Sequence, residues 1–246
     1  MDKLIYVAMT GARETMKSQS AVSHNLANIN TPGFRAVQHS MQSAPIDGTG
    51  LPTRVNALMA GEGWSNREGA MLQTGRTLDI AIQGDGWLAV QGPDGEEAYT
   101  RAGNLRVSPT GMLETATGQL VLGKGGPISM PQFERIDLGG DGRISVLPLG
   151  SPPNGIAEVD RLKLVNPPRE ELQRIDNGLF RRSDGEPALA DAEVRIASGQ
   201  LETSNVNAAQ ALVEMIELSR RFEMQVRSMN QAEKMDEAAT RLMQMS

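Results

Sequence analysis

Apolar residues recur at helical spacing near the N-terminus. They stand three or four positions apart at Ile5, Ala8, Ala12, Val22, Leu26 and Ile29, with Thr15 and Gln19 at the intervening positions. This spacing matches one face of an α-helix and predicts a helix from about Lys3 to Asn28. Because Thr31, Pro32 and Gly33 follow, we expect the helix to stop before Phe34.

Apolar and small residues near the C-terminus alternate in steps of four and three. They are Ala208, Leu212, Met215, Ser219, Phe222, Val226 and Met229, and after a shift of one position Ala232, Met235, Ala239 and Leu242. The pattern predicts a helix from about Val206 to Met243, with Ser204 or Asn205 as its N-cap. We call such a row of apolar and small residues along one helix face a seam. It requires a partner helix, either within the chain as a bundle or in another subunit.

The middle of the chain consists of short alternating runs separated by glycine-rich turns. Leu78, Ile80 and Ile82 alternate with less apolar residues, and residues 84–86 and 87–90 then read as the turn and second strand of a β-hairpin. Similar units recur about every ten residues, which is typical of a compact all-β domain. Residues 35–73 have weak periodicity and are rich in Gly, Ser, Pro and Met, which favours an extended connector.

The expected fold class is therefore α+β, with long terminal helices and an inserted all-β domain. We expect four parts: an N-terminal helix over residues 1–30, a connector over 31–73, a β domain over 74–197, and a return segment with the second helix over 198–246.

Composition excludes several classes of function. Thirty acidic and 24 basic residues give a net charge of −6, which disfavours nucleic-acid binding because that needs a positive field. Without cysteine the chain has no disulfide, thiolate nucleophile or cysteine-ligated metal. No apolar run is long enough to span a membrane, and the N-terminus lacks the pattern of a cleaved secretory signal.

Two glycine-rich segments resemble ligand-binding loops only in part. Residues 118–124 match the first seven positions of a P-loop, but Gly125 stands where Ser or Thr must reach magnesium, and Pro127 prevents the helix that would follow. We interpret this segment as a strand that leads into a turn. Residues 137–142 lack the ligands of a calcium loop and are predicted to form a hairpin turn.

Catalytic groups are sparse. His24 and His39, the two histidines, lie in the predicted helix and the connector, so a metal site is not expected. No Gly-x-Ser-x-Gly motif presents a nucleophile. Asp79 and Asp85 could serve a glycosidase, although we interpret them as solvent-facing acids of a strand and a turn. We therefore expect that the protein is not an enzyme and that it binds no cofactor and no metal. A β-domain hydrolase or glycan-binding module remains the remote alternative.

Four segments resemble the motifs of one protein family. Residues 25–35 read Asn-Leu-Ala-Asn-Ile-Asn-Thr-Pro-Gly-Phe-Arg and resemble the signature that ends the N-terminal helix of bacterial flagellar axial proteins of the rod and hook. Residues 77–87 resemble the LD-x-AI-x-G-x-GF segment of that family, with Trp87 in place of the usual Phe. Residues 99–105 are similar to its Y-T-R-x-G segment, and residues 198–207 to its G-x-LE-x-SNV segment. The signature residues are Asn25, Leu26, Ala27, Asn28, Gly33, Phe34, Ser204, Asn205 and Val206.

The resemblance implies a structural subunit of the proximal rod of the flagellar basal body, with a distal-rod or hook-type paralogue as the alternative. In that family both terminal helices form a coiled-coil inner layer around the axial channel, and the rod transmits torque across the periplasm. The implied partners are other rod proteins and the flagellar type III export apparatus, which passes unfolded subunits without signal cleavage. Folding would then be coupled to assembly.

The two seams supply the residues that we expect at subunit interfaces. They are Ile5, Ala8, Ala12, Val22, Leu26, Leu212, Met215, Phe222, Val226 and Met229. Their polar interruptions should weaken the pairing of the helices within one chain. Six methionines in or directly after the second helix suit packing either against non-identical neighbours or within a core.

Overall fold

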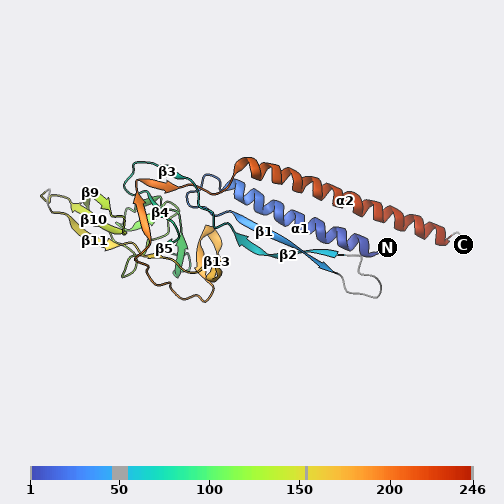
Figure 1. The fold of residues 1–246 in the computed structure, drawn as a ribbon, viewed down its shortest axis with the longest axis horizontal. Helices are drawn as coiled ribbons and strands as arrows, with labels where there is room; N and C mark the ends of the chain where they lie inside the picture. The colour runs from blue at the N-terminus through green and yellow to red at the C-terminus, as the bar shows by residue number, and fades with distance from the viewer. Residues whose placement is uncertain (1, 46–54, 153–154, 245–246) are drawn as a thin grey trace. The chain divides into compact units, whose positions relative to one another are not determined.

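The computed structural model describes residues 2–45, 55–152 and 155–244 and separates into two compact units. The first unit contains Met1–Ile29, Ala36–Ser65 and Val206–Ser246. The second contains Asn30–Arg35 and Asn66–Asn205, and Figure 1 shows the elements of both. The second unit is thus inserted into the sequence of the first.

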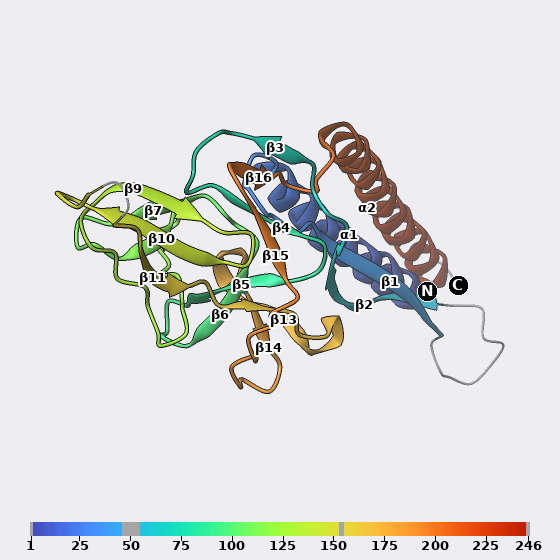
Figure 2. The ribbon, with the colours of Figure 1, turned by 60° about the vertical axis from the view of Figure 1, so that its left-hand side comes forward.

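The first unit consists of two helices and a hairpin. Helix α1 spans Asp2–Ala27 and helix α2 spans Ala208–Gln244, and they run antiparallel side by side (Figures 1 and 2). Strands β1 (Val37–Pro45) and β2 (Val55–Trp64) form an antiparallel hairpin that packs on another side of α1. α1 therefore contacts both α2 and the hairpin.

The ends of the helices agree with the predicted limits to within two residues, but the cap of α2 differs. Asn207 precedes the helix, and its side-chain Oδ1 accepts a hydrogen bond from the backbone N–H of Gln210 at 3.1 Å. This is the bond that an N-cap side chain makes. Asn207, rather than Ser204 or Asn205, therefore caps α2.

The segment expected to be an extended connector contains the hairpin. Val37 pairs with Trp64 at its base, and the register shifts between Ser40 and Met41. Its strands are rich in Gly, Ser and Gln and do not alternate cleanly between apolar and polar residues. The usual sequence signal for a strand was therefore absent. Residues 46–54 lie outside the described part of the chain.

The second unit is built from short antiparallel strands. Its strands are β3 (Met71–Gln73), β4 (Ile80–Gln83), β5 (Trp87–Gln91), β6 (Glu97–Thr100), β7 (Leu105–Val107), β8 (Leu113–Thr115), β9 (Phe133–Leu138), β10 (Arg143–Pro148), β11 (Ala157–Arg161), β12 (Leu164–Val165), β13 (Leu172–Arg174), β14 (Phe180–Arg182), β15 (Arg195–Ser198) and β16 (Gln200–Glu202). Two 3₁₀ turns, η1 (Arg169–Glu171) and η2 (Asp176–Gly178), flank β13. The largest sheet has the order β12-β5-β6-β14-β13, and a second has the order β11-β10-β9.

The predicted hairpin of residues 78–90 is wrong in its pairing. β4 pairs with β15 far along the chain, whereas β5 pairs with β6 and β12. The intervening Gly84-Asp85-Gly86 turn carries the chain from one sheet to another. Gly84 has a φ of 71°, and a Cβ on Gly86 would lie 2.7 Å from Val194, so both positions require glycine.

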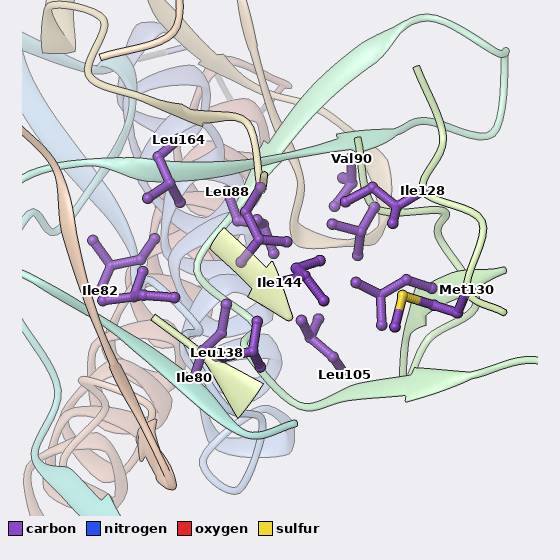
Figure 3. Packing of buried hydrophobic residues seen from close by; sticks show 14 of the residues in the cluster. Ile80, Ile82, Leu88, Val90, Leu105, Ile128, Met130, Leu138, Ile144 and Leu164 are labelled. Carbon is purple, nitrogen blue, oxygen red and sulfur yellow. The ribbon is translucent and has the colours of Figure 1, made fainter. Parts of the chain in front are cut away.

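The core of the second unit lies between these sheets. Ile80 and Ile82 from β4 and Leu88 and Val90 from β5 pack with Ile144 from β10, and Figure 3 shows them converging with side chains from the intervening loops. Leu105, Leu113 and Val121 are completely buried. Aliphatic side chains rather than aromatic rings therefore supply most of the packing.

Tyr99 provides a measurable probe of this core. Its side chain is 1% exposed, and its hydroxyl accepts a hydrogen bond from the N–H of Ala188 at 2.8 Å and donates one to Glu97 at 3.1 Å. Burial raises the pKa of the Tyr99 phenol from 10.0 to about 12. The folded state therefore binds this proton more tightly than the unfolded state does.

Below about pH 10, the bound proton of Tyr99 should contribute its full share to the free energy of unfolding. This contribution, about 2–3 kcal/mol, should be lost as the pH rises through about 12. A Tyr6→Phe background leaves Tyr99 as the single tyrosine, so its absorbance titration can be compared with unfolding measured across the same range. The matched control adds Tyr99→Phe, which should remove this part of the pH dependence. A folded-state titration midpoint at the ordinary tyrosine value would contradict the assignment.

Candidate functional site

The two helices meet along a narrow seam with a small apolar centre. Val22 of α1 packs with Ala211 and Leu218 of α2, and Leu26, Val206 and Met215 lie at the edge of this cluster. Along the rest of the seam, the Thr15 hydroxyl lies 3.2 Å from Gln225 Oε1, and Gln19 Nε2 donates to Ser219 at 3.4 Å. The polar interruptions noted in the sequence therefore pair with polar groups within one chain.

The phase of the α2 seam differs from the prediction at its beginning. Ala208 and Leu212 are exposed, and Ala211 and Leu218 take the buried positions that face α1. Apolar residues spaced alternately four and three positions apart do not by themselves show which of two neighbouring helix faces is buried. A second series with the same spacing can begin at a nearby position, as it does here at Ala211. Leu212 is thus not part of the intrachain seam.

The structure distributes the ten predicted interface residues among three environments. Ala12 and Val22 are buried, and Leu212 is 49% exposed. The other seven are partly buried: Ile5, Ala8, Leu26, Met215, Phe222, Val226 and Met229.

Large apolar side chains remain exposed on both helices. Leu212, Val213 and Ile216, which are 49%, 57% and 55% exposed, form a patch on a side of α2 that does not face α1. Met224 and Met235 are exposed farther along α2, and Tyr6, Met9 and Met16 are exposed on α1. Neighbouring exposed apolar side chains such as Leu212, Val213 and Ile216 are typical of a surface that binds another molecule.

Asn25 of the N-terminal motif joins α1 to the hairpin. Its side-chain amide donates to the carbonyl of Val37 at 2.9 Å, and its Oδ1 accepts from the Val37 N–H at 2.8 Å. Asn25 thus satisfies both backbone groups of the first residue of β1, as a neighbouring strand would. Asn28 in turn bonds the carbonyl of His24 at 2.9 Å in the last turn of the helix.

Three charged residues from distant parts of the sequence form a buried ion cluster in the second unit. Glu202 on β16 contacts Arg35 at 2.7 Å and Arg101 at 3.0 Å, and all three side chains are at most 2% exposed. One carboxylate oxygen also accepts the N–H of Gly69 at 2.8 Å. Arg101 also donates to the carbonyl of Gly86 at 2.9 Å.

The arginines depend strongly on this carboxylate. Burial lowers the pKa of the Arg35 guanidinium, and Glu202 opposes that shift. Arg35 donates from Nη1 to the carbonyl of Arg67, but its Nε and Nη2 find no acceptor among the described residues. The Arg101 guanidinium lies 5.6 Å from the ring centre of Trp87 and makes a cation–π contact with it. The indole ring of Trp87 is larger than the ring of the Phe that is usual at this position of the motif. Removing Glu202 would leave two buried positive charges without the counter-charge that they share.

The backbone around the ion cluster brings together the segments where the chain enters and leaves the second unit. The Gly33 N–H donates to the carbonyl of Glu202 at 2.8 Å, and the Asn205 N–H donates to that of Phe34 at 3.2 Å. Gly33 has a φ of 67°, and a Cβ there would lie 2.2 Å from the Arg101 carbonyl. The glycine of the motif is therefore required both by its backbone angle and by this close approach.

The sequence identified the motifs but not their contacts. Arg35, Arg101 and Glu202 each lie in a different motif segment, and no local pattern indicates that these segments meet. The one available signal was a single charged residue within each of three otherwise uncharged motifs. Buried charges need partners, so these residues were candidates for a common cluster.

The ligand-binding loops considered from the sequence have structural explanations. The predicted turn is confirmed, since the Gly123 N–H bonds the Gly126 carbonyl at 2.8 Å, but in place of the predicted strand residues 120–122 make isolated β-bridges, and Val121 among them is buried. A Cβ on Gly123 would lie 2.2 Å from a carboxylate oxygen of Asp160, which covers the turn. Residues 139–142 form the predicted hairpin turn between β9 and β10.

Asp79 corrects the expectation of a solvent-facing acid. It is 2% exposed and lies 3.4 Å from Arg76, whereas Asp85 is exposed in its turn. Across residues 2–45, 55–152 and 155–244, no group of three or more His, Cys, Asp and Glu side chains is arranged to hold a metal ion. Within the same ranges, neither helix is both long and apolar enough to cross a membrane.

Comparison with known proteins identifies relatives over the whole chain. Residues 5–35 match a family described as flagella basal body rod protein, residues 81–146 match the flagellar hook protein FlgE/F/G D1 domain, and residues 197–242 match the flagellar basal body rod FlgEFG protein C-terminal. The chain is 44% identical to the flagellar basal-body rod protein FlgF of Salmonella typhimurium, with 100% of both chains covered.

Two further relatives place this similarity in context. FlgF of Escherichia coli K12 is also 44% identical with full coverage of both chains. The flagellar basal-body rod protein FlgG of Bacillus subtilis is 30% identical over 91% of this chain and 92% of its own length. Similarity to the FlgF proteins is therefore greater here than similarity to this FlgG.

Proposed function

The chain belongs to the family of flagellar basal-body rod proteins, and we propose that it acts as a structural subunit of the proximal segment of the rod. The 44% identity to two FlgF proteins over complete chains supports this assignment. The 30% identity to a FlgG protein supports the distal-rod paralogue less well. The protein is a structural component of the basal body.

The exposed apolar patch of α2 is the observation that carries this function at the level of the structure. Leu212, Val213 and Ile216 gain burial only if another molecule covers them. We infer that neighbouring rod subunits do so, with α1 and α2 contributing to a coiled-coil inner layer around the axial channel. Such a layer would transmit torque through side-chain packing rather than through covalent links.

The ten residues predicted at subunit interfaces retain that proposed role in two ways. Leu212 is exposed and would contact a neighbour directly. Ala12 and Val22 are buried within the helix pair and would act by holding α1 and α2 in register. The partly buried residues would both contact neighbouring subunits and hold α1 and α2 in register. They are Ile5, Ala8, Leu26, Met215, Phe222, Val226 and Met229.

The small apolar centre of the intrachain seam supports assembly-coupled folding. Its completely buried apolar side chains are few, and polar pairs such as Thr15 with Gln225 fill the rest. We propose that the helices remain readily unfolded for passage through the flagellar type III export apparatus, without cleavage of a signal. They would become stable in the periplasmic rod, where other rod proteins are their partners.

Electron microscopy of basal bodies from a strain that lacks this protein tests the proposed function. We expect the rod to stop at or before its proximal segment, because later subunits would have no surface on which to pack. Complementation with the intact gene should restore the full rod. Assembly of a complete rod in the deletion strain would overturn the proposal.

Counting copies in purified basal bodies separates the two paralogues. A short proximal segment needs few copies, whereas a distal rod or hook needs many more. Quantitative mass spectrometry against a labelled standard gives this count directly. A number similar to that of the distal rod would favour the FlgG-type alternative.

A further inference from the structure

A shallow groove runs along the first turns of α2. Its volume is about 550 Å³, and its lining includes the apolar residues Val213 and Leu218, the acidic residues Glu214 and Glu217, and Arg221 at its far end. Glu214 has no ion-pair partner among the residues that the structure describes, and Glu217 is 3.8 Å from Arg221 in an exposed pair. The groove thus presents two carboxylates and one guanidinium beside apolar side chains, and within the described part of the chain the unpaired negative charge among them is that of Glu214.

The exposed side of α1 carries the complementary pattern. Met9, Arg13 and Met16 follow one another at spacings of four and three, so their side chains form one stripe. Met9 and Met16 are 50% and 57% exposed, and Arg13 is exposed with no acidic partner in the described ranges. A cation between two flexible apolar side chains matches an acidic apolar groove in both charge and chemistry.

The groove and the stripe cannot meet within one chain. Thr15 faces α2, and at 100° per residue Arg13 and Met9 point well away from it on the free side of α1. The same rotation of 100° per residue, applied to the antiparallel α2, places Glu214 and Glu217 on one flank of the helix pair, whereas Met9 and Arg13 lie on the opposite flank. A second copy can therefore present its stripe to the groove of the first.

We propose that Met9, Arg13 and Met16 of one copy dock into the Val213–Glu217 groove on α2 of a second copy of this chain. The inference rests on the proposed rod function and names the contact that orders neighbouring subunits. Because the two surfaces differ, the contact is heterologous and repeats without closing into a two-fold dimer. Each docked α1 runs antiparallel to the α2 that receives it.

The contact also sets an axial displacement. Within one chain Thr15 lies beside Gln225, so Arg13 is level with the part of α2 near Arg227. In the proposed contact Arg13 is level with Glu214 and Glu217 instead, which is a shift of about 17 Å along the helices. Copies displaced in this way build a staggered array and not a flat ring.

Disulfide trapping in assembled basal bodies tests the contact. The chain has no native cysteine, so Met16→Cys with Val213→Cys introduces one defined pair. Mild oxidation should give a ladder of dimers, trimers and longer species, and each single-cysteine variant serves as the control. If the ladder is absent, or if it ends at dimers, the proposed contact is wrong.

Charge reversal gives a second test that does not depend on cysteine chemistry. Arg13→Glu should abolish swimming, as should Glu214→Arg with Glu217→Arg, and the three substitutions together should restore it. Arg135→Glu on the exposed surface of β9 is the matched control and should swim normally. Failure of the combined variant to recover would overturn the pairing.

The two proposals fail differently. If the cysteine variant is present in basal bodies and supports swimming but forms no ladder, the rod function stands and the contact is wrong. If the intact protein is absent from purified basal bodies, the rod function itself fails.

Discussion

Glu202→Ala is expected to lower the free energy of unfolding of the second unit by about 3–5 kcal/mol. The substitution leaves Arg35 and Arg101 buried without their shared counter-charge, and it leaves the Gly69 N–H without its acceptor. Chemical denaturation of the purified protein measures the loss. Since a typical domain is stable by about 5–15 kcal/mol, the loss is a large fraction of the total stability and should lower the denaturation midpoint clearly.

Two variants make the Glu202 result specific. Glu202→Gln keeps the size of the side chain but removes its charge, so it should also destabilise the unit substantially. Asp137→Asn breaks an exposed pair with Arg135 and should change stability by no more than about 1 kcal/mol. Equal effects of Glu202→Ala and Asp137→Asn would show that the buried cluster does not stabilise the fold.

Leu212→Asp is expected to prevent incorporation into the rod while leaving the isolated protein folded. Leu212 is 49% exposed in the single chain, so the substitution should change monomer stability by no more than about 0.5 kcal/mol. In the assembled rod, burial of an unpaired carboxylate should cost at least about 3 kcal/mol at each contact. Swimming and rod length in a complemented deletion strain report the loss.

Asn230→Asp on the same helix is the matched control for Leu212→Asp. It adds the same charge at an exposed polar position outside the apolar patch, and swimming should be retained. If Leu212→Asp assembles as well as this control, the patch on α2 is not a subunit interface. Circular dichroism of both proteins checks that neither substitution unfolds the helix.

The terminal helices were predictable because their signal is local. Spacing in the sequence placed α1 and α2 to within two residues, since a helix buries side chains at a fixed period along one continuous segment. The choice between two adjacent faces of α2 was not local. It depended on how Ala211 and Leu218 meet Val22, which lies far away in the sequence.

The β region was predictable as a class but not as a set of partners. Alternation identified β4, and the apolar run after the glycine turn identified β5, yet β4 pairs with β15 because a strand's partner is chosen by packing across the whole unit. The ion cluster illustrates the same point. Residues 35, 101 and 202 become neighbours only after the sheets form, so no sequence window contains them together.

The hydrogen bonds from Gly33 to Glu202 and from Asn205 to Phe34 also bear on the order in which the protein folds. Thr15 and Gln225 are 210 positions apart, so pairing the helices first would close a very long loop. Once the second unit has folded, its two ends lie together, and the effective loop shortens to roughly forty residues, which saves about 1.4 kcal/mol of closure entropy. Folding of the inserted second unit therefore lowers the entropic cost of pairing α2, which is synthesised last, with α1.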